Sequence, residues 1–437
     1  MDSMKLAKSP RVVAGIACLF STMVLASGCV GTGAPLARLV VEAGDHHRSN
    51  TPVSITLTDG TIDLSGDGFH LVESSGSERS VLPVQIERGA PTRLWFILPG
   101  ETQAGTTREF ELHSGWARSE SSVEVVKDDK TLLIKQGDAS VLSYHHAIMP
   151  PPAGESKLYE RSAFIHPIWS PSGSVLTNIH PKDHYHHMGL WMPWTKTRFE
   201  GKEVDFWNLD RGQGTVRFNR VLSQTSGPVF GGFQVEHDHV ALQTASGEKL
   251  VLKEVWDVRV YNVGGPDKGD WICDFVSTQR CVAETPLLLE KYRYGGFGFR
   301  GAAEWKGDKA AYLTSEGKTR VDGHATRARW CDTAGVSDGQ WKGITHFSHP
   351  QNIRHPEAMR IWPGVEQQVF FNWAPIQLDD LSLDPGQDYV FRYRMIIHEG
   401  KVDVTRTERL WNSYAHPPVV TISVPQARVR SPVNYTY

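Results

Sequence analysis

The segment KLVLKEVWDVRVYN, residues 249–262, decides the fold. Its side chains alternate between two faces, and one face carries Leu252, Trp256 and Val258. This two-residue period is the pattern of a β-strand, and the segment is longer than most strands. Comparable segments, separated by turns that contain glycine and proline, span residues 215–223, 232–243 and 270–283. Together they predict an antiparallel meander of long strands.

Shorter alternating segments occupy the first quarter of the chain, at residues 54–58, 84–87, 93–98 and 108–113. Short strands at this spacing predict a small β-sandwich over residues 40–118. The long meander predicts a large antiparallel β-sandwich over residues 119–415. The expected fold is therefore all-β. Long strands with aromatic-rich loops suggest the supersandwich of galactose-mutarotase-like proteins.

Few segments show helical periodicity. The best helix candidate is residues 403–415, with Val404, Leu410 and Trp411 on its apolar side. The remaining residues, 416–437, contain prolines and no clear period, so an irregular tail is expected there.

The N-terminal residues 1–29 read as a lipoprotein signal peptide. Three positive charges precede an apolar run, residues 12–26, that is too short to span a membrane. The run ends in LASGC, residues 25–29, which resembles a bacterial lipobox with Cys29 as the lipidated N-terminus. An ordinary secretory signal is the alternative. Residues 30–39 would then form a tether, and the protein would lie in the cell envelope, in the periplasm or at the outer membrane.

Composition excludes several classes of partner. The net charge is −3 at pH 7 and the chain has no block rich in lysine or arginine, so nucleic acid is not expected to bind. The only membrane contact expected is through the lipid at Cys29. The other mature-chain cysteines, Cys273, Cys281 and Cys331, can form at most one disulfide, so the fold must rest on a hydrophobic core.

Residues 166–210 are rich in histidine, tryptophan, proline and glycine, which predicts loops that carry chemistry. Their centre is DHYHH, residues 183–187. On an extended segment His184 and His186 would share one side and His187 would point to the other. The pair could act as acid and base, ligate one divalent metal ion with His166 or a carboxylate, or simply pack in the structure. The sequence leaves these three roles open.

Other side chains extend this candidate site. Trp191 and Trp194 beside the histidines could form a platform for the apolar face of a sugar. Glu290 ends an apolar run, so it is expected to be a partly buried acid or base, or else to pair with Arg293. Arg300 could hold a carboxylate such as that of a uronate.

A second cluster of polar and aromatic residues lies later in the chain. It contains His346, together with Asn372 and Trp373, in segments that read as loops or short strands. These residues could share a rim with the histidine loop.

Several segments resemble one family of bacterial secreted proteins, which is labelled "methane oxygenase PmoA". The resemblance rests on HPIWSPSGSVLTN, HPKDHYHHMGLWMPW, VDFWNL, RYGGFGFRG and FFNWAPI, which begin at residues 166, 180, 204, 293 and 370. It implies a secreted, β-rich protein that acts on carbohydrates. It carries over no catalytic residue, and a multi-helix membrane oxygenase does not fit a mature chain without a spanning segment.

The sequence thus predicts a cell-envelope lipoprotein that acts on a saccharide as a lyase, epimerase or hydrolase, by acid–base chemistry without a cofactor. The expected catalytic residues are His166, His184, His186, Glu290 and His346. The expected substrate-binding residues are Trp191, Trp194, Arg293, Arg300, Asn372 and Trp373. The alternatives are a glycan-binding lipoprotein without catalysis, and an enzyme that depends on a divalent metal ion held by His184 and His186.

Overall fold

The computed structural model describes residues 34–57, 62–75, 78–117, 119, 121–266 and 268–424. The predicted signal peptide, including Cys29, lies outside these residues. The described chain is almost entirely β-structure, as predicted, with α1 (Val404–Ala415) as its α-helix. No helix of the described chain is long and apolar enough to cross a membrane.

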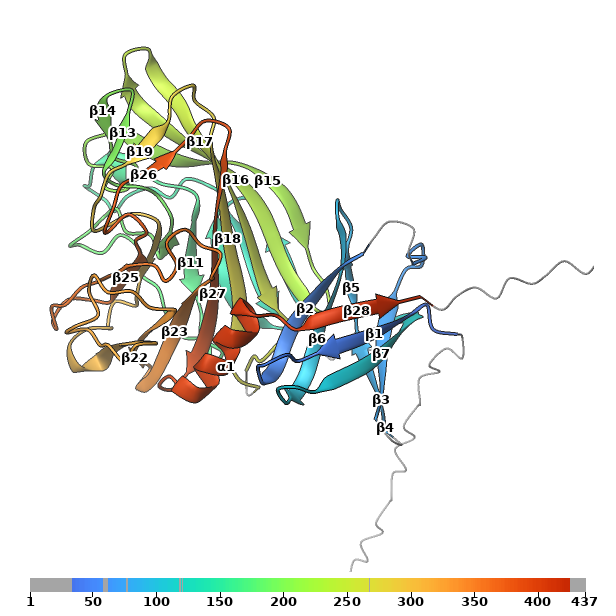
Figure 1. Cartoon of the computed structure of the whole chain (residues 1–437). Helices are drawn as coiled ribbons and strands as arrows, with labels where there is room; N and C mark the ends of the chain where they lie inside the picture. The colour runs from blue at the N-terminus through green and yellow to red at the C-terminus, as the bar shows by residue number, and fades with distance from the viewer. Residues whose placement is uncertain are drawn as a thin grey trace, which may run out of the picture. The chain divides into compact units, whose positions relative to one another are not determined.

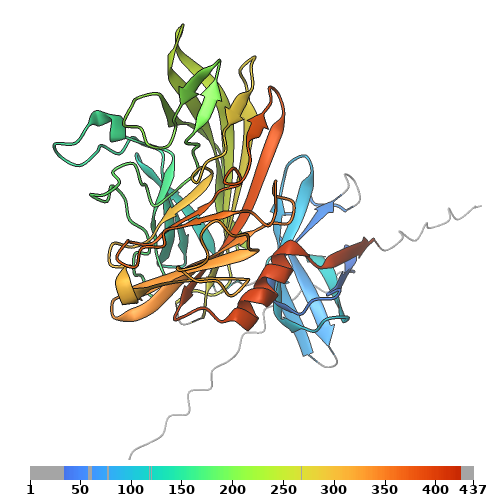
Figure 2. The same cartoon turned by 60° about the vertical axis from the view of Figure 1, so that its left-hand side comes forward.

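The core of the fold is a sheet of eight antiparallel strands, and the predicted meander forms half of it. The strands β15, β16, β17 and β18 are neighbours in that order, so each long strand pairs with the next along the chain. Figures 1 and 2 show them side by side. In spatial order the sheet contains β15 (Gly214–Thr225), β16 (Phe230–Thr244), β17 (Gly247–Tyr261), β18 (Trp271–Cys281), β27 (Asp388–Glu399), β23 (Gln340–Ser348), β22 (Trp330–Ser337) and β21 (Ala310–Thr314).

A second sheet of eight strands packs on the first through aromatic side chains. Trp256 of the first sheet contacts Tyr144 of the second, and Phe275 contacts Phe297, with ring centroids 6.0 and 5.4 Å apart. Burial of such large rings supplies much of the driving force for folding. The second sheet contains β24 (Met359–Ile361), β25 (Phe370–Trp373), β20 (Phe297–Arg300), β12 (Leu190–Trp191), β11 (Phe164–Ile168), β10 (Ala139–His145), β9 (Thr131–Gln136) and β8 (Val123–Lys127).

A small sheet adjoins this large β-sandwich. It contains β14 (Lys202–Val204), β13 (Thr197–Phe199), β19 (Leu287–Leu289) and β26 (Leu381–Leu383). Cys273, Cys281 and Cys331 are buried and none of them forms a disulfide. The large sandwich is therefore held by packing rather than by covalent links.

The N-terminal strands form a smaller sandwich of two sheets around their own core, which includes Leu39, Phe96 and Phe110. One sheet contains β28 (Val419–Ser423), β1 (Ala37–Glu42), β7 (Thr107–Ser114), β3 (Phe69–Ser75) and β4 (Glu78–Pro83). The other contains β2 (Arg48–Leu57), β6 (Thr92–Thr102) and β5 (Gln85–Glu87).

Two predicted boundaries are wrong. The tether was expected to run to residue 39, but β1 begins at Ala37. The tail from residue 416 was expected to be irregular, but β28 pairs antiparallel with β1, and Figure 1 shows the two strands side by side. Val420 and Ile422 pack against the small core, which explains why this segment becomes a strand.

The predicted helix is present, but one of its three expected apolar residues is not buried. Asp403 caps α1, since its carboxylate accepts a hydrogen bond from the Arg406 N–H at 3.1 Å. Leu410 and Trp411 are buried as expected, whereas Val404 is exposed.

Candidate functional site

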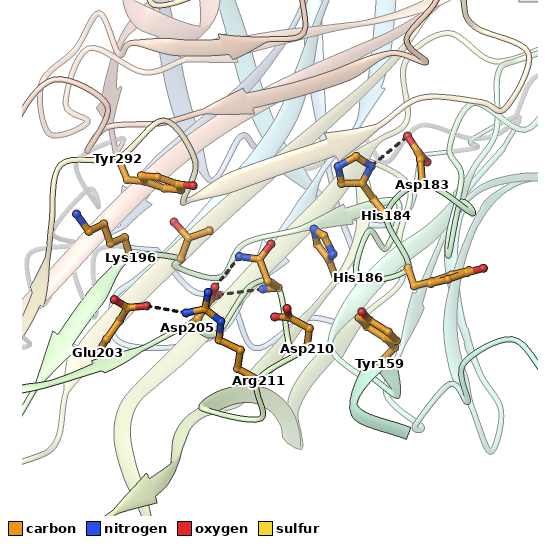
Figure 3. Close-up of a pocket in the computed structure, with 13 residues that line it drawn as sticks. Tyr159, Asp183, His184, His186, Lys196, Glu203, Asp205, Asp210, Arg211 and Tyr292 are labelled. Atoms are coloured by element: carbon orange, nitrogen blue, oxygen red, sulfur yellow. Dashed lines mark hydrogen bonds and ion pairs between the residues drawn. The ribbon is translucent and has the colours of Figure 1, made fainter. Parts of the chain in front are cut away.

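A cavity of about 380 Å³ lies beside the histidine-rich loop. Most of its lining comes from the stretch that the sequence singles out, and Figure 3 shows ten of the lining side chains labelled around a common opening. The lining residues are Tyr159, Asp183, His184, Tyr185, His186, Thr195, Lys196, Glu203, Asp205, Asn208, Asp210, Arg211 and Tyr292. Almost all of them can donate or accept hydrogen bonds, so the cavity suits a ligand with many hydroxyl groups.

Hydrogen bonds along the backbone shape the histidine loop. The His184 N–H donates to the Pro181 carbonyl at 2.8 Å, and the His187 N–H donates to the His184 carbonyl at 3.0 Å. The loop closes where the His180 N–H donates to the His187 carbonyl at 2.9 Å. The segment therefore forms successive turns and is not extended.

These turns correct the predicted orientation of the histidines. His184 and His186 both line the cavity, with ring centroids 5.5 Å apart. His187 was expected to point away from them, but its ring lies 4.8 Å from His184 and 4.6 Å from His186. It is only 1% exposed and stacks on Phe370, so it supports the other two rings from behind.

Both cavity histidines are neutral at pH 7. Burial, together with the positive charges of Arg161 and Arg300, lowers the pKa of His186 to about 3. Burial also lowers the pKa of His184, and the adjacent Asp183 only partly offsets this effect. A neutral imidazole offers one nitrogen as a proton acceptor and one as a donor.

A buried arginine holds the carboxylate that lies beside His184. Both Asp183 oxygens accept hydrogen bonds from Arg300 Nη2 at 2.9 Å, and Asp183 Oδ2 lies 3.0 Å from His184 Nδ1. Arg300 also donates to Gln368 at 2.7 Å and is fully buried. The expectation that Arg300 holds a substrate carboxylate is therefore wrong, because Asp183 occupies that place.

Asp205 is a cavity residue that the sequence did not single out. Its Oδ1 accepts the N–H groups of Trp207 and Asn208 at 2.8 and 2.9 Å, and its Oδ2 accepts Asn208 Nδ2 at 2.5 Å. Burial, together with the charge of Asp210, raises the pKa of Asp205 despite these bonds. The available signal was Asp-x-x-Asn within VDFWNL, since an Asp side chain that bonds the following N–H groups is typical of such turns.

Two of the predicted catalytic histidines do not line the cavity. His166 is paired with the Thr177 hydroxyl at 2.8 Å, and burial lowers its pKa to about 4. His346 is fully buried, stacks on Phe371 and lies 3.1 Å from the Thr333 hydroxyl. Burial lowers the pKa of His346 to about 3. Both rings pack in the β-sandwich as neutral groups.

Glu290 and Arg293 do not form the predicted pair. Glu290 contacts Arg198 at 2.9 Å and Lys196 at 3.6 Å, and it does not line the cavity. The Arg293 guanidinium lies 5.9 Å from the ring centre of Tyr292, a cavity residue. Arg293 is thus near the cavity edge, while Glu290 has a structural role in an ion pair.

The predicted tryptophan platform is wrong. Trp191 and Trp194 are both fully buried, so neither can present a face to a sugar. Trp191 packs on Trp207 at 4.8 Å, and Trp194 Nε1 donates to Gln279 at 2.8 Å. Aromatic rings at the cavity come instead from Tyr159, Tyr185 and Tyr292.

Asn372 and Trp373 are also buried in β25. Asn372 Nδ2 donates to the Phe297 carbonyl at 2.7 Å, and its Oδ1 accepts the Gly295 N–H at 3.1 Å. Asn372 therefore fixes the glycine-rich segment that precedes β20 and does not reach a ligand in the cavity.

The metal alternative finds no ligand set in the described part of the chain. There, no group of three histidine, cysteine, aspartate or glutamate side chains is arranged to hold a metal ion. His184 and His186 lie together without a third ligand. Stable protein sites for transition metals use at least three such ligands.

Comparisons with known proteins give a family and sixteen distantly similar chains of solved structures, including two from Enterococcus faecalis. No curated protein matches the sequence. One solved structure is a protein of glycosyl hydrolase family 38 from Enterococcus faecalis, with 9% identity and a TM-score of 0.44 over 89% of this chain and 47% of that one. The other is an α-mannosidase from Enterococcus faecalis V583, with 9% identity and a TM-score of 0.43 over 89% of this chain and 46% of that one. The chain spans about half the length of these proteins.

The match to a family model is more extensive. It covers residues 131–412, which contain nearly all of the large β-sandwich and every residue that lines the cavity. The model's description does not mention a methane oxygenase. Because the match covers more than half of the sequence, the protein belongs to the family of unknown function DUF6807.

Proposed function

We propose that this protein is a carbohydrate-active enzyme that transfers protons to and from a saccharide bound in the cavity beside residues 183–187. The proposal rests on a carboxyl group and two imidazoles that line one cavity. Asp205 has a raised pKa, and the imidazoles of His184 and His186 are neutral. Several titratable groups whose pKa values are shifted by burial, gathered in one cavity, are typical of a functional site.

The roles follow from these protonation states. A carboxyl group with a raised pKa keeps its proton to a higher pH, so Asp205 can donate a proton to a departing or rearranging oxygen. The neutral imidazole of His184 can accept a proton from a sugar hydroxyl or from a carbon next to a carbonyl group. The pKa of His186, about 3, makes that ring a weak base that is better suited to hydrogen-bonding the ligand. His184 is the better base of the two, because the carboxylate of Asp183, held by Arg300, lies beside its ring and favours the protonated form.

The lining supports a saccharide as the ligand. Carboxylates, an amide, an ammonium group and hydroxyls surround the space, and three tyrosine rings supply flat apolar surface for the C–H face of a sugar. The volume of about 380 Å³ is at the small end of the usual range for ligand pockets. A lyase, an epimerase and a hydrolase would each need this combination of acid and base.

The location also belongs to the proposal. The lipobox-like LASGC, residues 25–29, supports attachment to the cell envelope through a lipid on Cys29. The saccharide would then be met outside the cytoplasm.

Substitution of Asp205 tests the proposed chemistry. The purified protein is incubated with a panel of neutral and acidic oligosaccharides, and products are followed by chromatography and mass spectrometry. Asp205→Asn is expected to lower turnover by about a hundredfold or more, since general acid catalysis contributes on this scale. Glu316→Gln is the control, because Glu316 is exposed, lies outside the cavity and should not affect turnover.

Two results would contradict the proposal. Turnover that Asp205→Asn leaves unchanged would remove Asp205 from the chemistry. Saccharide binding by the wild-type protein without any product would favour the glycan-binding alternative instead.

A further inference from the structure

A second cavity, of about 250 Å³, is lined in part by two chain segments, near residues 159 and 211, that also contribute to the first. In the first segment, Tyr159 lines the first cavity, and its neighbours Leu158 and Glu160 line the second. In the other segment, Arg211 lines the first cavity and Gly212 lines the second. Asp205, His184 and His186 do not line the second cavity. Its most unusual lining residue is Arg161.

Arg161 is a buried cation without a partner. Its side chain is 2% exposed, and it makes no hydrogen bond or ion pair with any described residue. Its Nε and Nη1 are buried and unpaired. The backbone holds the residue in place, because Arg161 and Met149 exchange two hydrogen bonds of 3.0 and 2.8 Å.

The nearest negative charges are already occupied by other donors. Glu254 acts on Arg161 through space, but its carboxylate accepts hydrogen bonds from Ser277 at 2.5 Å and Gln279 at 3.0 Å and lies 2.8 Å from His239 Nε2. Asp205 also acts on Arg161 from a distance, and its oxygens accept bonds from Trp207 and Asn208. Neither carboxylate satisfies the guanidinium donors.

Burial lowers the pKa of Arg161 to about 10, so the side chain stays charged at pH 7. A buried charge without a partner is costly, and each such case in a folded protein calls for a missing partner. The other charges that line the second cavity leave a positive balance. Arg217 is neutralised by Glu248 at 2.8 and 3.0 Å, and Lys157 and Glu160 cancel, which leaves Arg161.

We infer that Arg161 is an anion-recognition residue, and that the second cavity binds the oxyanion of an acidic saccharide, either a uronate carboxylate or a sulfate ester. Guanidinium groups bind both anions through charge-assisted hydrogen bonds. The description of the ligand as a saccharide rests on the proposed function, whereas the anion site rests on Arg161 alone.

Thermal stability and calorimetry of the full-length protein test this inference with three probes: D-glucuronate, inorganic sulfate and D-glucose as the neutral control. Arg161→Met removes the charge at similar volume, and it should fold because loss of an unpaired buried charge is neutral or stabilising. Arg161→Lys keeps the charge with a different set of donors. Arg280→Met is the matched control, since Arg280 is an exposed arginine paired with Asp388 outside both cavities.

Glucuronate or sulfate is expected to stabilise the wild-type protein and Arg280→Met, and to bind Arg161→Met at least about tenfold more weakly. Arg161→Lys should fall between them. The anion that binds more tightly shows whether the site prefers a carboxylate or a sulfate ester. Glucose should show no difference between wild type and Arg161→Met.

The inference is overturned if neither anion binds the wild-type protein, which would leave water as the partner of Arg161. The inference is also overturned if both anions bind Arg161→Met as tightly as they bind the wild-type protein. Asp205→Asn separates this result from the proposed function, because it should lower turnover by about a hundredfold while anion binding at Arg161 persists.

Discussion

Glu357 gives the protein a pH-dependent stability that can be measured without a substrate. Its side chain is fully buried and accepts hydrogen bonds from the Ser348 hydroxyl at 2.6 Å, Asn352 Nδ2 at 3.0 Å and the Tyr393 hydroxyl at 2.9 Å. Burial nevertheless raises its pKa from 4.5 to about 7. The folded protein therefore holds this proton over a pH range in which the unfolded chain has lost it.

The sign of the effect follows directly. The contribution of Glu357 to stability is fully present below pH 4.5, where both states are protonated, and it is lost as the pH rises towards 7. The difference between the two pKa values corresponds to about 3 kcal/mol. About 2.5 kcal/mol of this falls between pH 5 and pH 8.

Glu357→Gln replaces the carboxyl group with an amide that does not ionise. Urea unfolding of wild type and variant is compared from pH 5 to pH 8, with Glu316→Gln as an exposed control. The stability of wild type relative to Glu357→Gln should fall by about 2.5 kcal/mol across this range. Parallel curves of unfolding free energy against pH for the two proteins would show that Glu357 does not cause the pH dependence.

Further predictions concern the histidines, metal and anchoring. His184→Ala should lower turnover by about a hundredfold or more with the fold intact. His346→Ala should lower the free energy of unfolding by about 3 kcal/mol, while turnover per folded molecule, measured alongside denaturation, stays the same. Loss of activity in His346→Ala at full stability would contradict its packing role. EDTA should leave turnover and melting temperature unchanged. A metal ion found by elemental analysis in the wild-type protein, and lost when His184 or His186 is replaced, would contradict this prediction. Cys29→Ser should move the protein from the membrane fraction to the soluble fraction; an unchanged distribution on fractionation would reject the anchor.

The parts of the fold that were predictable from the sequence are those determined locally. The alternation in residues 249–262 predicted a long strand, and β17 spans nearly the same residues. By contrast, β28 depends on a partner far away in the sequence, since Val419–Ser423 become a strand only by pairing with β1. The composition of this segment, VVTIS, is itself rich in β-branched residues. The prediction of an irregular tail followed the neighbouring prolines instead.

The site divides in the same way. The histidine loop was found because its composition is unusual, but the roles of its neighbours depend on burial that only the tertiary structure decides. Trp191, Trp194 and His346 are chemically suitable for a site and are instead used for packing. Asp205 was missed because a single aspartate in a turn is common, and its raised pKa arises from the surrounding fold.

The most direct test of the central claim is a crystal structure of Asp205→Asn with an oligosaccharide that the wild-type protein converts. The variant should bind the ligand without converting it, so that the complex persists in the crystal. We expect a sugar in the cavity beside residues 183–187. One of its oxygens should lie within about 3 Å of the residue 205 side chain, and another of its polar groups should lie within hydrogen-bonding distance of His184 or His186. A ligand bound elsewhere, with this cavity empty, would contradict it.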